Sequence, residues 1–160
     1  SYDEDSGLFA WKIDKGNNAK SGSIAGSLHK PSGYYLIKIN NRRYHSHILA
    51  WVYVYGSFPN GEIDHINHEQ GDNRIENLRD VSRVDNCRNR SIPLNNTSGI
   101  MGVYFHKKSN RWRAIINIDG KQKTLGQFAD FSEAVNARKN AEVLYGYHKN
   151  HGNSKGDYNE

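Results

Sequence analysis

The sequence contains a single cysteine, Cys87, among its 160 residues. One cysteine excludes an internal disulfide and a zinc site built from cysteine pairs. No run of about eighteen apolar residues is present, so we expect no membrane span. The first residues are acidic and polar and lack the apolar core of a signal peptide. We therefore expect a cytoplasmic protein.

Acidic side chains become scarce after residue 90. Residues 1–90 hold 12 basic and 11 acidic side chains, whereas residues 91–160 hold 10 and 6. A basic C-terminal part beside a nearly neutral N-terminal part favours binding of a polyanion by the C-terminal part. A solvated basic surface is the alternative interpretation.

Alternating apolar positions predict strands at residues 8–14 and 33–45, with a turn at Asn40-Asn41. Residues 16–27 are rich in Gly, Ser and Asn and are predicted to be loop with room for one short strand. Residues 46–55 allow two interpretations. The β-branched and aromatic run at 52–55 favours a strand, whereas a cap at Ser46, a shared apolar face and Gly56 favour a helix. We predict the helix.

A strand–loop–strand–helix pattern follows. Residues 62–65 are predicted as a strand, 66–74 as a loop and 77–81 as a second strand. Ser82 with Asp85 forms a capping box that predicts a helix over 83–90. The first turn of this helix, which contains Asn86, is expected to face back toward the end of the first strand.

This pattern places chemically useful residues together. Asp64-His65 is followed by Asn77 and Asn86, 12 and 21 positions after the histidine. Hydrolysis of a phosphodiester needs a base to deprotonate water and a hard cation to stabilise the developing charge. Two oxygen donors, Asp64 and Asn86, suit Mg²⁺ or Mn²⁺. We predict that Asn77 orients His65, whereas Asn73 ties up the loop backbone.

Adjacent residues in a strand point to opposite faces, so either Asp64 or His65 must sit at the end of its strand.

Residues 44–90 resemble the HNH endonucleases of the ββα-metal fold, in the branch common among phage homing and nicking enzymes. The motif positions are His47, Asp64-His65, the stretch 72–78 and Asn86. The resemblance implies that His65 is the general base and that Asp64 and Asn86 hold one divalent cation, Mg²⁺ or Mn²⁺, in each active site. It also implies that Asn77 braces the histidine.

Two departures from the family pattern matter. The third motif position is Asn86 rather than a histidine, and Arg90 stands where a further histidine would follow, which favours labile Mg²⁺ over tightly bound zinc. Ile48 occupies a position where relatives often carry arginine. Arg88 and Arg90 are candidates to bind DNA in its place, with a solvated helix face as the alternative.

A second unit is predicted after a linker at residues 91–97, where Pro93 discourages a helix. Residues 101–106, 112–118 and 121–125 are predicted strands, and Asp119-Gly120 indicates a tight hairpin between the last two. A helix is predicted from Ser132 to Gly146. Its expected packing stripe consists of small and apolar residues, namely Ala134, Ala137, Ala141 and Leu144.

Residues 97–146 resemble the DNA-binding domain of plant ethylene-response factors, in which a three-stranded sheet enters the major groove. The resemblance assigns Gly102 and Phe128, with Leu125 and Gly126, to packing. Trp112 is expected to be part of the core, with a contact to the sugar-phosphate as the alternative. The candidate DNA contacts are the basic residues of the strands and turns: His106, Lys107, Lys108, Arg111, Arg113, Lys121 and Lys123.

Together these observations predict an α+β protein with a ββα-metal nuclease module and a small three-stranded antiparallel sheet packed on one helix. The expected domains are residues 1–92 and 97–148, followed by a polar tail over 149–160. We expect a Mg²⁺-dependent endonuclease that nicks double-stranded DNA, acts as a monomer or weak dimer, and works in a phage-infected bacterial host. The alternatives are a DNA-binding regulator with an inactive nuclease fold and an RNA-binding protein whose aromatic strands stack bases.

Overall fold

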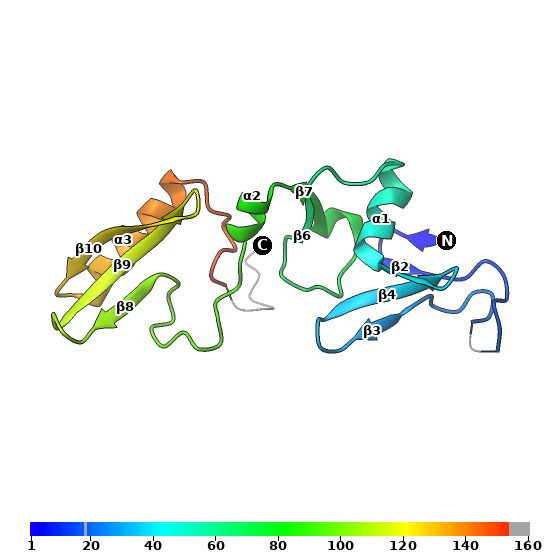
Figure 1. Cartoon of the computed structure of the whole chain (residues 1–160), viewed down its shortest axis with the longest axis horizontal. Helices are drawn as coiled ribbons and strands as arrows, with labels where there is room; N and C mark the ends of the chain where they lie inside the picture. Colours follow the sequence, from blue (N-terminus) through cyan, green and yellow to red (C-terminus); the bar gives the residue numbers. More distant parts are fainter. Residues whose placement is uncertain (18, 154–160) are drawn as a thin grey trace. The chain divides into compact units, whose positions relative to one another are not determined.

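The computed structural model describes residues 1–17 and 19–153. They form two compact units, Ser1–Asn86 and a second that begins at Cys87 (Figure 1). Helices and small antiparallel sheets are mixed, so the predicted α+β class is confirmed. Within the described part of the chain, no helix is long and apolar enough to cross a membrane. The division falls at the end of a short helix, earlier than the linker expected at residues 91–97.

The first unit contains a small sheet of two-residue strands, two further small sheets and two α-helices. Its strands pair in the order β1-β2, β3-β4-β5 and β6-β7, always antiparallel. Its elements in chain order are β1 (Tyr2–Asp3), β2 (Leu8–Phe9), β3 (Ser27–His29), β4 (Tyr34–Ile39), β5 (Arg42–His45), α1 (Ser46–Tyr55), β6 (Glu62–His65), η1 (Ile75–Asn77), β7 (Leu78–Val81) and α2 (Arg83–Cys87).

The turn between β4 and β5 is the one that the sequence predicts. Asn40 and Asn41 both have positive φ, 47° and 63°, as a two-residue hairpin turn of this hand requires. The strand predicted over residues 8–14 is shorter than expected, because the strand covers Leu8–Phe9 and Ala10 adds an isolated bridge to Ile24. The hairpin predicted at Asn40-Asn41 is confirmed. Its sequence signal lies in the turn residues themselves.

Helix α1 confirms the helical interpretation of residues 46–55. Gly56 ends it in the left-handed conformation, with φ of 71°, which glycine adopts without a steric penalty. Ser46 does not cap the helix, because His45 occupies the N-cap position without a side-chain hydrogen bond. The helix packs through Ala50, which is completely buried against Tyr2 and Leu78.

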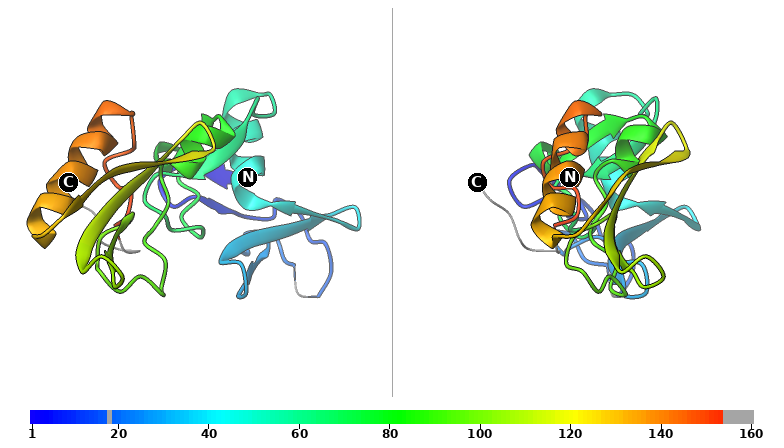
Figure 2. Two further views of the ribbon diagram at one scale, coloured as in Figure 1. Left: turned by 60° about the vertical axis from the view of Figure 1, so that its left-hand side comes forward. Right: turned by 90° about the vertical axis from the view of Figure 1, so that its left-hand side faces the viewer.

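The second unit is a three-stranded antiparallel sheet with one helix. The strand order is β10-β9-β8, and α3 lies along one face of the sheet in each view (Figures 1 and 2). The elements are β8 (Val103–His106), β9 (Arg111–Ile118), β10 (Lys121–Phe128) and α3 (Phe131–Leu144).

Small residues let α3 approach this sheet closely. Ala114 and Ala134 are completely buried and pack with Val103, while Trp112 and Phe128 lie at the edge of the same cluster. This confirms the packing roles predicted for these side chains. The helix begins two residues earlier than one capped by Ser132, because Asp130 is the N-cap and accepts a hydrogen bond from the Ser132 nitrogen at 2.6 Å.

Two predictions for this unit are wrong. Leu144 is 75% exposed, and the buried polar pair Arg138 and Glu142 completes the inner stripe of α3 instead. The polar tail expected from residue 149 docks on the unit over 149–153. There His151 is 4% exposed and its Nε2 lies 3.1 Å from Arg138 Nη2. The rest of the expected tail, 154–160, lies outside the described residues.

Candidate active site

His65 is the last residue of β6 and is 5% exposed. Its ring contacts those of Tyr34 on β4 and His47 on α1, with centroid distances of 5.8 and 5.0 Å. Its Nε2 lies 3.2 Å from Asn73 Oδ1. Asn73 Nδ2 donates to the Gly71 carbonyl at 3.3 Å, which assigns the amide oxygen to the histidine side. His65 Nε2 therefore carries the proton, and Nδ1 carries the lone pair.

The surroundings of His65 keep its ring neutral. Burial lowers the pKa of His65, and the hydrogen bond that His65 donates to Asn73 and the charges of Asp64 and Asp72 offset this only in part. A neutral imidazole at neutral pH is able to accept a proton from water. The position therefore suits a general base.

Asn73 is held by the N-terminal hairpin. The residue is 1% exposed, and its carbonyl accepts a hydrogen bond from the Tyr2 hydroxyl at 2.7 Å. Gly7 has φ of 69° and lies so close to the backbone of Asn73 and Arg74 that a Cβ would collide with it. The β1–β2 hairpin thus fixes the loop that orients His65, a role for which the sequence offered no local signal.

Asn77 does not hold the histidine. Its Nδ2 donates to the Asp72 carbonyl at 2.8 Å, and its Oδ1 accepts from the Asn67 nitrogen at 3.0 Å. These bonds close the loop between β6 and β7. Asn73 and Asn77 therefore exchange the roles that the sequence analysis gave them.

Asp64 precedes His65 on β6, and its charge acts on both His65 and Tyr34. Asp64 is 6% exposed and stands opposite Arg79 in the strand register. Arg79 donates from Nε at 2.9 Å and from Nη2 at 2.6 Å, both to Asp64 Oδ2. Arg79 thus holds Asp64 across the hairpin, and His65 occupies the end of the strand.

Asn86 reaches the same hairpin from α2. The predicted capping box is present, because Ser82 Oγ donates to Asp85 Oδ2 at 2.7 Å and accepts from the Asp85 nitrogen at 3.2 Å. Asn86 Nδ2 donates to Glu62 Oε2 at 2.6 Å. The helix therefore returns to the first strand as expected, but at its first residue. Among the described residues, nothing donates a hydrogen bond to Asn86 Oδ1.

The donors on this face of the hairpin are all oxygens. Glu62 and Asp64 alternate on one side of β6, and Asn86 lies beside Glu62. In the described part of the chain, no three His, Cys, Asp or Glu side chains are arranged to hold a metal by themselves. The set fits a hard cation such as Mg²⁺ or Mn²⁺ that keeps several waters. Asp64 and Asn86 remain its candidate ligands, with Glu62 as a third that the sequence analysis missed.

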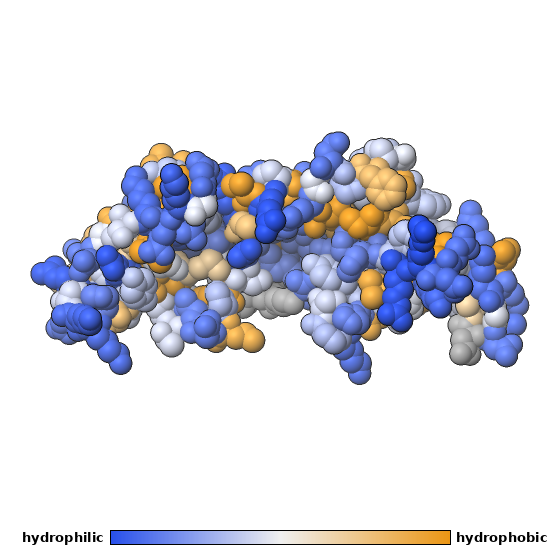
Figure 3. Space-filling model, viewed as in Figure 1, coloured by the Kyte–Doolittle hydropathy of each residue, from blue (hydrophilic) through white to orange (hydrophobic). Residues whose placement is uncertain are grey.

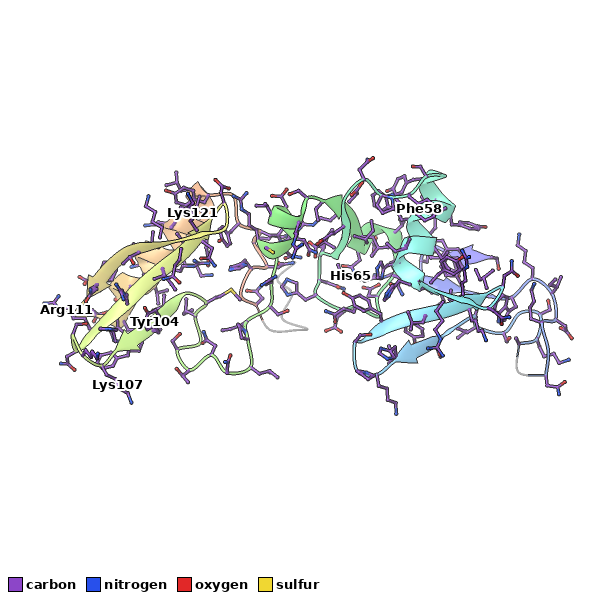
Figure 4. The ribbon with its side chains drawn as sticks, viewed as in Figure 1. Phe58, His65, Tyr104, Lys107, Arg111 and Lys121 are labelled. Atoms are coloured by element: carbon purple, nitrogen blue, oxygen red, sulfur yellow. The ribbon has the colours of Figure 1, made fainter. Side chains whose placement is uncertain are left out.

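The sheet of the second unit has a face that α3 does not cover. Arg111 and Arg113 lie on it, because they alternate with the buried Ala114 side of β9, and Arg113 stands opposite Tyr104. The Arg113 Nε is buried and meets no hydrogen-bond acceptor within the described residues. Lys107 and Arg111 lie at the β8–β9 end of the sheet (Figure 4).

The turn between these strands is also polar. His106 Nδ1 lies 2.8 Å from Ser109 Oγ, and Lys107 and Lys108 are exposed. Hydrophilic side chains cover much of the visible surface of this sheet (Figure 3).

Lys121 and Lys123 do not share the open face. They stand opposite Ile118 and Ile116 in the register, on the side of the sheet that carries α3. Lys123 Nζ donates to the Tyr145 hydroxyl at 3.1 Å and lies over that ring. Lys121 lies near the opposite end of the sheet from Lys107 (Figure 4).

Arg88 and Arg90 follow α2 rather than extend it, since that helix ends at Cys87. Arg88 packs over the Tyr147 ring at 5.8 Å. Arg90 is exposed and donates to Cys87 Sγ at 3.3 Å. The alternative of a solvated helix face does not apply, because neither arginine lies on the helix. Arg90 is exposed and Arg88 is half-buried.

Part of the chain is similar to known proteins. Protein 3.8 of Escherichia phage T7 is 35% identical to the chain over 77 residues, which are 48% of this chain and 64% of the phage protein. The match thus spans less than two thirds of that relative. No solved structure matches. Residues 44–88 match the HNH endonuclease family, so the segment that carries α1, β6, β7 and α2 is similar to an HNH endonuclease domain.

Proposed function

We propose that the protein is a metal-dependent endonuclease that nicks one strand of double-stranded DNA. The observation that carries the proposal is the buried His65, held by Asn73 so that Nδ1 has the lone pair, on a hairpin that also carries Asp64. The match of residues 44–88 to HNH endonucleases supports it.

In this mechanism His65 Nδ1 accepts a proton from a water molecule, and the water oxygen forms a bond to phosphorus. The bond from phosphorus to the 3′ oxygen breaks, and that oxygen takes a proton from solvent. The products are a 5′ phosphate and a 3′ hydroxyl. Asp64 and Asn86 would hold one Mg²⁺ or Mn²⁺, which when bound supplies positive charge beside the reacting phosphate.

The second unit binds the duplex in this proposal. Its open sheet face carries Arg111 and Arg113, and its turn carries Lys107 and Lys108. Side chains of this kind contact phosphates and fix the position of the protein on DNA. The resemblance to plant ethylene-response factors supports insertion of the sheet into the major groove. With one catalytic site per chain, each encounter cuts one strand.

Conversion of supercoiled plasmid to open circles tests the proposal. We expect nicking with Mg²⁺, none with a chelator, and a loss of about 10²–10⁴-fold in His65→Ala, the usual contribution of a general base. His29→Ala is the matched control, since His29 is exposed and its ring is hydrogen-bonded to the nearby Ser32. Equal nicking by His65→Ala and wild type would refute the role of His65.

A DNA-binding regulator without catalysis is the second candidate. The observation that favours it is the ion pair of Asp64 with Arg79, which already neutralises the candidate metal ligand. Such a protein would bind duplex DNA and leave the plasmid supercoiled with Mg²⁺ or Mn²⁺. The same assay therefore separates the two candidates.

A further inference from the structure

Arg79 binds the candidate metal ligand in an unusual way. Its Nε and Nη2 both donate to one oxygen of Asp64, at 2.9 and 2.6 Å. A bidentate pair would instead use both carboxylate oxygens. The guanidinium therefore covers the position on Oδ2 where a cation would bind.

The fold holds the two charges together. Asp64 and Arg79 are directly opposite each other on β6 and β7, so the hairpin register itself fixes their separation. The Asp64 side chain is only 7% exposed, and a buried carboxylate without a counter-ion is strongly destabilising. The metal-free protein thus requires a cation at this position, and Arg79 provides it.

Arg79 is also able to leave. Its side chain is 28% exposed, and its Nη1 donates no hydrogen bond to any described residue. Arg74, in the neighbouring loop, differs because its guanidinium bonds both Asp72 and Glu76. Within the described chain, Arg79 forms an ion pair only with Asp64, so one displacement frees the whole group.

We infer that Arg79 is an exchangeable counter-ion of Asp64. The guanidinium occupies Oδ2 until a divalent cation takes that oxygen, because the two cannot use the same lone pairs and both carry positive charge. The freed Arg79 then faces solvent beside the site and binds a phosphate of the DNA. This inference rests on the proposed function, since it assumes that Asp64 is a metal ligand.

The alternative is that Arg79 is a permanent brace. In that case it would stay on Oδ2 and orient the remaining oxygen of Asp64 toward the cation. The two roles predict opposite effects on metal affinity. Removal of a competitor strengthens binding, whereas removal of a brace weakens it.

Mn²⁺ binding to the full chain without DNA, measured by electron paramagnetic resonance, tests the inference. We expect Arg79→Gln to bind Mn²⁺ at least about threefold more tightly than wild type, and Asp64→Asn to lose the site. Arg83→Ala is the control for net charge, because Arg83 is exposed on α2 and forms no ion pair with the described residues. Affinity in Arg79→Gln equal to or weaker than in Arg83→Ala would overturn the inference.

A second measurement uses the wild-type protein and does not depend on the folding of a variant. The Arg79 Nε–H resonance is expected to shift toward the position of a solvent-exposed arginine as Mg²⁺ is added. A resonance that stays in place while Mg²⁺ binds would show that the ion pair persists, and would overturn the inference alone. Absence of any Asp64-dependent Mn²⁺ binding in wild type would overturn the proposed metal-dependent function and the inference with it.

Discussion

The candidate site residues of the two units differ in burial. In the first unit His65, Asp64, Asn73 and Asn77 are all at most 6% exposed and form hydrogen bonds or ion pairs inside the fold. In the second unit the candidate binding residue Arg111 is exposed on an open face over an apolar core. A single substitution at these buried positions of the first unit is therefore expected to change geometry and stability together. A substitution on the open face is expected to remove one DNA contact among several.

The sharpest test of this contrast is within the first unit. Asn73→Ala removes the acceptor on His65 Nε2, so we expect the single-turnover cleavage rate to fall about 10- to 100-fold. Asn77→Ala leaves that bond intact and opens the loop instead. We expect it to lower the free energy of unfolding by about 1–3 kcal/mol, the cost of unsatisfied buried polar groups, with a smaller change in rate. Equal rates in the two variants would remove the distinction between them.

Asn73 and Asn77 also show which features could be predicted from the sequence and which could not. The Asp64-His65 pair, the two strands and the Ser82 capping box are encoded locally, and all are found as predicted. Spacing alone could not determine which asparagine reaches the imidazole. The answer depends on the path of residues 66–77 and on Tyr2, 71 positions before Asn73.

A second example comes from the other unit. The hairpin at Asp119-Gly120 was predictable from its turn residues, but the side of the sheet on which Lys123 lies was not. It depends on the register between β9 and β10, which places Lys123 opposite Ile116. Similarly, the docking of His151 on Arg138 is a long-range contact of a polar segment that carries no periodic signal.

Core substitutions in the second unit are expected to act through folding. Val103→Ala should lower the free energy of unfolding by about 2 kcal/mol, because Val103 is 2% exposed and the change leaves a cavity. The matched control is Val143→Ala, where the side chain is 83% exposed and the expected change is within about 0.5 kcal/mol. Urea unfolding followed by tryptophan fluorescence measures both, and similar losses would contradict the assigned core.

Acid should destabilise the first unit through its buried histidines. Burial, with His65 and His45 nearby, lowers the pKa of His47 to about 3, against about 6.5 in the unfolded chain. Between these values the unfolded state takes up a proton that the folded state does not, so stability falls as pH falls through this window. The stability that His47 contributes is fully present only above pH about 6.5.

We therefore expect the wild type to lose about 1–2 kcal/mol more than His47→Gln between pH 7.5 and 5. Chemical unfolding at the two pH values measures this difference. His29→Gln, at an exposed position, should behave like wild type. Identical pH dependence in wild type and His47→Gln would show that His47 is not held in its neutral form.

The smallest effects are expected on the open face of the sheet. Arg113→Ala should weaken duplex binding and reduce the slope of log K against log salt by about 0.9, the value for one phosphate contact. Lys123→Ala removes the same charge from the α3 side, where Lys123 contacts Tyr145, and should leave the slope unchanged. Binding titrations at several salt concentrations measure both slopes. A larger effect of Lys123→Ala would show that Lys123, rather than Arg113, contacts a phosphate.

The most direct test of His65 as the general base is chemical rescue. His65→Gly leaves a space of imidazole size beside Asn73, so added imidazole should restore plasmid nicking in this variant. Asp64→Asn, which retains the histidine, should gain nothing from imidazole. Nicking by His65→Gly at the wild-type rate without imidazole, or rescue of both variants to the same extent, would show that His65 is not the base.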